Sequence, residues 1–90
     1  MTPKQRDLAR HALGLPNNDK QSYRNRFVTN SGCPDHKEWM QMVAKGHAWR
    51  RAGSELTGSD DLFGMTLNGA RAALERRETL CPEDFPKQTT

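Results

Sequence analysis

The sequence of 90 residues predicts a small α+β domain with three to four helices and a two-stranded antiparallel hairpin. Two observations indicate this class. Apolar residues recur at helical spacing in segments that begin at capping residues or end at glycine. Between two of these segments, residues 47–51 alternate between two sides as a half-buried strand does, and the apolar run 62–65 follows as a return strand.

The first helix is predicted to begin after Thr2. Thr2 and Gln5 have the spacing of a capping box, and Pro3 occupies the first helical position. Gly14, two residues before Pro16, supplies the stop signal. The apolar stripe of this helix consists of Leu8, Ala9, Ala12 and Leu13.

Residues 22–29 fit two structures. Tyr23 and Phe27 are four residues apart, as they would be on one face of a short helix. The β-branched and aromatic composition of the same segment also fits a strand. The short helix is the preferred interpretation.

The central helix is predicted to start at Asp35, with Glu38 three residues later, and to stop at Gly46 in a left-handed cap. Residues 52–61 then have the composition of a loop. Thr66 is predicted as the N-cap of a last helix. Its apolar face consists of Leu67, Ala70, Ala73 and Leu74.

The stretches MVAKGHAWRR (residues 42–51) and LFGMTLNGARAAL (residues 62–74) resemble the wing of MarR-type winged-helix regulators. In that family a helix ends in glycine, a strand ending in basic residues enters the wing, and the return strand runs into a Thr-x-x-Gly helix start. This partial match over residues 39–74 implies a winged-helix-like fold. The whole chain also resembles small proteins of tailed phages and prophages, which implies a phage or host protein as partner.

Composition limits the core and the location. Only 33% of the residues are hydrophobic, so the core must be concentrated in a few clusters. The sequence shows no membrane-spanning run and no cleavable signal pattern, which favours the cytoplasm of a bacterial host cell. Residues 1–81 are expected to form one domain, and residues 82–90 a mobile tail. The predicted core residues are Leu8, Leu13, Leu15, Phe27, Trp39, Val43, Trp49, Phe63, Leu67 and Leu74.

Positive charge is concentrated in the first third of the chain. Residues 1–26 contain six basic and two acidic side chains, a balance of +4, whereas the whole chain has +3. Such a surface could contact phosphates without reading sequence, although solvated helix faces explain the same pattern. The cations expected to contact phosphates in that alternative are Lys4, Arg6, Arg10, Arg24, Arg26, Arg50 and Arg51.

The helix before the hairpin argues against base reading. It starts with two acids, Asp35 and Glu38, which would face phosphates unfavourably, and only Gln41 is a natural reader of base edges. Sequence-specific DNA recognition is therefore not expected.

Metal and catalytic sites are not expected. Cys33 and His36 have ligand-like spacing, but no second closely spaced pair would complete a zinc site. The adjacent Asp60 and Asp61 are typical turn formers rather than an acid-base couple. No cofactor motif occurs, and the protein is predicted to be non-enzymatic.

Trp49 is the aromatic residue with the best claim to a binding role. It lies between His47 and Arg51 on one side of a predicted strand, and the combination of Trp with Arg is typical of interface hot spots. The preferred function is therefore a small module that binds a protein, with Trp49, Arg51 and His47 at the interface. The alternative is a nucleic-acid-binding accessory protein of transcription that contacts only the phosphate backbone.

Overall fold

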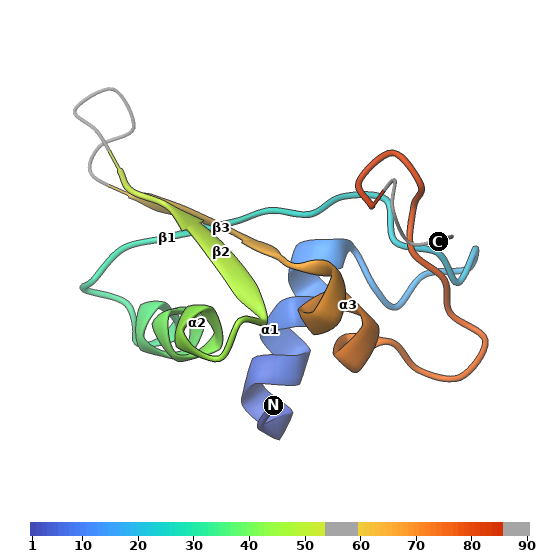
Figure 1. Ribbon diagram of the computed structural model, residues 1–90, viewed down its shortest axis with the longest axis horizontal. Coiled ribbons are helices and arrows are strands. Elements are labelled where there is room, and N and C mark those ends of the chain that lie inside the picture. The colour runs from blue at the N-terminus through green and yellow to red at the C-terminus, as the bar shows by residue number, and fades with distance from the viewer. Residues whose placement is uncertain (54–59, 86–90) are drawn as a thin grey trace.

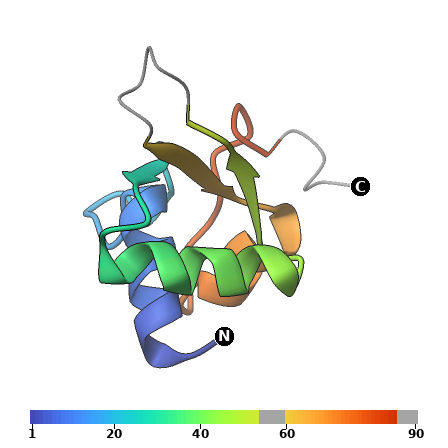
Figure 2. The ribbon, with the colours of Figure 1, turned by 90° about the vertical axis from the view of Figure 1, so that its left-hand side faces the viewer.

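The computed structural model describes residues 1–53 and 60–85 and shows an α+β domain with two layers (Figure 1). Its three strands form one antiparallel sheet in the order β1-β3-β2. The helices lie together on one side of this sheet (Figure 2). The elements are α1 (Pro3–Leu13), β1 (Phe27–Thr29), α2 (Pro34–Ala44), β2 (Ala48–Arg51), β3 (Asp61–Met65) and α3 (Leu67–Ala73).

The predicted hairpin is confirmed in its pairing. Strands β2 and β3 are antiparallel, with Ala48 opposite Met65 and Arg51 opposite Leu62. The connection is one residue shorter than expected because Asp61 already belongs to β3. Residues 54–59 of the predicted loop lie outside the described residues.

The prediction of only two strands is wrong, and so is the helix preferred for residues 22–29. Strand β1 occupies part of that segment and pairs with β3 on the side away from β2, with Phe27 opposite Phe63. The side chain of Asn25 explains why an extended chain replaces a helix. Its amide accepts from the N–H of Met65 at 2.7 Å and donates to the C=O of Met65 at 3.1 Å. These two bonds hold the chain before β1 beside β3.

The predicted N-cap and stop signals agree with the structure in most places. Thr2 and Gln5 form the capping box of α1, and Gly14 ends that helix with a φ of 81°. Thr66 caps α3 by accepting from the N–H of Gly69 at 3.1 Å. Gly46 follows α2 with a φ of 78°, as a left-handed cap requires.

The start of α2 differs from the prediction. The helix begins at Pro34, one residue before Asp35, and its N-cap is Cys33, which makes no side-chain cap hydrogen bond. Proline is favoured at the first helical position because its missing N–H has no partner to lose there. Asp35 therefore lies in the first turn of α2 rather than at its cap.

The core joins the sheet to α2 through stacked aromatic rings. The Trp39 and Phe63 rings stack with centroids 5.4 Å apart, and Phe27 lies 5.3 Å from Trp39. Of the predicted core residues, Leu13, Leu15, Trp39 and Phe63 are buried. Five others pack against the core while partly exposed: Leu8, Phe27, Val43, Leu67 and Leu74. Trp49 is not buried and is 36% exposed.

The segment after α3 belongs to the core. Leu80 is 3% exposed and Phe85 is 5% exposed, and neither was predicted as a core residue. Phe85 lies within the range 82–90 that was expected to form a mobile tail. Residues 86–90 lie outside the described residues.

One buried ion pair ties α1 to this segment. The side chains of Arg10 and Glu78 are each 7% exposed, and Arg10 Nη2 donates to Glu78 Oε2 at 2.8 Å. Arg10 Nη1 also donates to the C=O of Ala73 at 3.0 Å. The hydrogen bonds between the two groups raise the pKa of Arg10 and lower the pKa of Glu78. Arg10 is therefore a structural residue.

Replacing Gly46 by valine is expected to destabilise the protein by about 1 to 2 kcal/mol, because a β-branched residue tolerates a positive φ badly. No atom lies within 4 Å of the position of an added Cβ, so the cost comes from the backbone alone. Urea unfolding monitored by tryptophan fluorescence measures it. Gly46→Asn is the control, since asparagine tolerates the left-handed region, and an equal loss in both variants would contradict the explanation.

Replacing Glu78 by glutamine is expected to cost about 3 kcal/mol in the free energy of unfolding, because it removes the buried counter-charge of Arg10. Glu75→Gln is the matched control. Glu75 also lies near Arg10, at 3.8 Å, but its side chain is 55% exposed, so its loss should cost about 1 kcal/mol or less. Equal losses in the two variants would show that burial of the pair is not what matters.

Candidate binding surface

The two faces of the sheet differ because residues alternate along β3. Asp61, Phe63 and Met65 face the helices and are buried. Leu62 and Gly64 must therefore face the opposite side. No described helix lies over that side (Figures 1 and 2).

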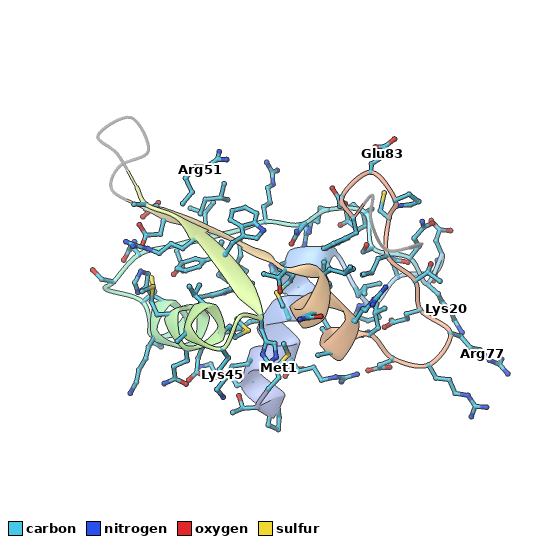
Figure 3. The ribbon with its side chains drawn as sticks, in the orientation of Figure 1. Met1, Lys20, Lys45, Arg51, Arg77 and Glu83 are labelled. Carbon is cyan, nitrogen blue, oxygen red and sulfur yellow. The ribbon has the colours of Figure 1, made fainter. Side chains whose placement is uncertain are left out.

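The pairing of the strands brings three further side chains to this uncovered side. Val28 lies opposite Leu62 on β1, and Arg51 lies opposite Leu62 on β2. Trp49 lies opposite Gly64. We call the surface formed by Val28, Trp49, Arg51 and Leu62 the open sheet face. Figure 3 shows Arg51 pointing away from the helices.

Apolar groups dominate this surface. Val28 is 58% exposed and Trp49 is 36% exposed, and both are among the exposed large hydrophobic residues of the described chain. The indole of Trp49 lies against Gly64, because a Cβ added to Gly64 would be 2.1 Å from Trp49 Cζ2. Gly64 thus gives the ring a flat backbone to rest on, and the ring remains partly exposed to a partner.

A carboxylate network holds the base of the hairpin on the helix side. Asp61 Oδ2 accepts from Arg50 Nε at 2.8 Å, and it lies 2.7 Å from His36 Nε2, which donates in the tautomer that has its proton there. Asp61 Oδ1 accepts from the N–H of Gly53 at 2.8 Å. These bonds, that of Arg50 first, hold the pKa of Asp61 well below its ordinary value. Asp61 thereby links α2 to both strands of the hairpin.

The predicted partner-binding residues divide into two groups. Trp49 and Arg51 belong to the open sheet face. His47 is half-buried where the hairpin meets α3, and a Cβ on Gly69 would lie 1.8 Å from the His47 carbonyl oxygen. Val28 and Leu62 were not predicted. Leu62 could have been found, since it alternates with the predicted core residue Phe63, whereas Val28 was assigned to a helix.

Most of the cations predicted to contact phosphates already have protein partners. Four of them form ion pairs with acids: Lys4 with Asp35, Arg6 with Glu75, Arg10 with Glu78 and Arg50 with Asp61. Arg24 donates to the C=O of His11, and its guanidinium lies 5.3 Å from the ring centroid of Tyr23. Arg26 and Arg51 are exposed and have no acidic partner within residues 1–53 and 60–85.

The predicted C-x-x-H pair does not converge on one point. His36 turns toward Asp61, whereas the exposed thiol of Cys33 lies 3.7 Å from Asn30 Oδ1. In the part of the chain that the structure describes, no group of three or more His, Cys, Asp and Glu side chains could hold a metal ion. Nor does any described helix have the length and apolar character needed to cross a membrane.

A scan against protein-family models and searches of curated proteins and of solved structures found no match to this chain.

The Asp61 network should make stability depend on pH. The pKa of Asp61 is lower in the folded state than in the unfolded state, where it is near 4. Asp61 therefore stabilises the fold fully above the unfolded pKa, and this stabilisation is lost as the pH falls through the lower folded pKa. Asp61→Asn should therefore be less stable than the wild type at pH 7, and the difference should shrink below about pH 4. Urea unfolding at several pH values measures this. The exposed Asp19→Asn should show little difference at any pH, and a constant deficit in Asp61→Asn would contradict the assignment.

Proposed function

We propose that this chain is a non-enzymatic module that binds another protein through the open sheet face. The observation that carries the proposal is the exposed Trp49, seated on Gly64 beside the apolar side chains of Val28 and Leu62. Contiguous apolar groups on the surface of a small domain typically mark an interaction site. The uncovered side of the sheet is where such a partner would dock.

The composition of the surface supports a protein as partner. Trp and Arg are enriched among the residues that dominate binding energy, and Trp49 and Arg51 occupy alternate positions of β2 on this face. Packing against Gly64 already restricts the indole, so little side-chain entropy remains to be lost on binding. Trp49 is therefore the proposed anchor.

A winged-helix-like scaffold is part of the proposal. It is supported by the end of α2 at a left-handed glycine, by the β2–β3 hairpin and by the capping of α3 by Thr66. Strand β1 extends this hairpin to three strands and supplies Val28 to the surface. By resemblance, the partner would be a host or phage protein.

Nucleic-acid binding is the second candidate, and one observation favours it. Arg51 is exposed without an acidic partner among the described residues and shares one face of β2 with Trp49. Proteins that bind single strands stack bases on aromatic rings and hold phosphates with cations. The ion pairs made by four of the other cations reduce the charge available to phosphates. We therefore place this function second.

Replacing Trp49 by alanine is expected to weaken partner binding by about 2 kcal/mol or more. Capture from a bacterial lysate on the immobilised chain identifies the partner, and titration calorimetry measures its affinity. Met40→Ala is the matched control, because Met40 is 38% exposed but belongs to α2, away from the open sheet face. Melting temperatures confirm that both variants are folded. Loss of binding in Met40→Ala alone would contradict the proposed surface.

Nuclease treatment and salt separate the two candidate functions. Protein binding should survive nuclease and depend weakly on salt. Binding to random duplex DNA would instead fall with salt, with a logarithmic slope of about −0.9 per neutralised phosphate. A steep slope at micromolar affinity, unchanged in Trp49→Ala, would favour the second candidate and reject the first.

A further inference from the structure

Among the described residues, none pairs with the outer edge of β1 at Val28. The N–H and C=O of Met65 bond to the side chain of Asn25, so the polar backbone groups of Met65 point toward the β1 side of the sheet. Backbone polar groups alternate in direction along a strand, so those of Phe63 must point the same way. Phe63 lies opposite Phe27, which makes Phe27 a hydrogen-bonded position of β1. Val28 then directs its N–H and C=O away from β3.

Two other hydrogen bonds agree with this direction. On the β2 side of β3, the N–H of Thr66 donates to the C=O of His47 at 3.1 Å, as the alternation requires. On the outer edge of the first strand, the N–H of Arg26 donates to the C=O of Ala12 at 3.2 Å. The backbone N–H groups of residues 26 and 28 thus both point away from β3. Among the described residues, α1 covers this edge at Arg26 but not at Val28.

A hollow lies beside this edge. It has a volume of about 310 Å³ and is lined by His11, Arg24, Arg26, Phe27 and Val28. Its lining contains two arginines and no carboxylate. A second hollow of about 470 Å³ shares His11 and Phe27 with it, and that one is lined by Lys4 together with Asp7 and Asp35. The hollow beside Val28 is therefore the one with unbalanced positive charge.

We propose that the edge of β1 and this hollow bind the C-terminal end of a partner protein as an added antiparallel strand. The inference rests on the proposed function, since it specifies which part of a protein partner is taken. An added strand obtains affinity from backbone hydrogen bonds, and a terminal carboxylate can be captured by convergent donors. The outward N–H and C=O of Val28 supply the backbone hydrogen bonds. The guanidinium groups of Arg24 and Arg26 supply the donors for the terminal carboxylate.

Charge and geometry select the direction of the added strand. An antiparallel strand beside Val28 runs toward Arg26 with its C-terminal end first, whereas a parallel strand would bring its N-terminal end there. A terminal carboxylate is stabilised by the two arginines, and a terminal ammonium group is repelled by them. Because Ala12 already occupies the edge at Arg26, the added strand must end near that point.

The contacts of the last two partner residues follow from this geometry. The penultimate residue lies opposite Val28, donates its N–H to the Val28 C=O and accepts from the Val28 N–H. The terminal carboxylate accepts from Arg26 and from Arg24 Nη1, since Arg24 Nε and Nη2 already donate to the C=O of His11. The backbone of the penultimate residue thus pairs with both the N–H and the C=O of Val28.

Two peptide mixtures test the proposal on the full chain. Both consist of hexapeptides randomised at the last four positions, one with free C-terminal carboxylates and the other with carboxamides. The immobilised chain should enrich members of the free-acid mixture only. An enriched peptide is then labelled for fluorescence anisotropy, and its affinity should fall about tenfold or more when the terminus is amidated. N-methylation of its penultimate residue, which removes the N–H opposite Val28, should cause a similar loss.

Matched variants of the chain locate the site. Arg26→Gln should weaken binding of the free-acid peptide about tenfold. Arg76→Gln removes the same charge from an exposed residue outside both the hollow and the open sheet face, and it should leave the affinity unchanged. In nuclear magnetic resonance spectra, the amide of Val28 should shift on binding and become protected from hydrogen exchange. A peptide that binds without protecting this amide would overturn the added-strand geometry.

Other outcomes of these experiments would reject the added-strand inference or the proposed function. Failure to enrich either mixture, or equal enrichment of both, overturns this inference, while Trp49-dependent capture of a partner would leave the proposed function standing. Enrichment of amidated peptides with an internal Asp or Glu would show that acidic side chains are bound rather than chain ends, which also overturns it. An Arg26-dependent dimer in analytical ultracentrifugation would identify a second copy of the chain as the occupant and reject a separate partner. If Trp49→Ala leaves all partner capture intact, the proposed function is rejected, and the present inference loses its basis with it.

Discussion

The alternation of side chains along β3 is the constraint on which the two surfaces of this domain depend. Asp61, Phe63 and Met65 point to the helices, where Phe63 stacks on Trp39 and joins the sheet to α2. Residues 62 and 64 point the other way and have no helix above them among the described residues. Because the period of a strand is two, a shift of one residue would exchange these sets and expose the core.

Local signals in the sequence were sufficient for part of the fold. The caps at Thr2 and Thr66, the left-handed Gly46 and the β2–β3 hairpin depend on residues close together in the chain. Strand β1 could not be predicted in this way. Its partner β3 is more than 30 residues away, and the contacts that select the extended chain come from Met65. Long-range contacts of this kind override weak local propensity.

The candidate surface was predictable to a similar extent. Trp49 and Arg51 could be placed on one face because the strand that contains them was recognised from its alternation. Val28, which is the apolar neighbour of Leu62 on this face, was missed because β1 was not predicted. The pairing of the cations could not be read from composition. Arg10 and Glu78 are 68 residues apart, and only the packed structure shows that this arginine is buried.

The separation of Arg10 and Glu78 also bears on how the chain folds during synthesis. On the ribosome, α1 emerges long before residue 78, and until then Arg10 has no carboxylate with which to enter the interior. An unpaired guanidinium resists burial, so the packing of α1 is delayed until the segment after α3 is available. We therefore expect the packing of α1 to be a late step in the folding of a nascent chain rather than its first step.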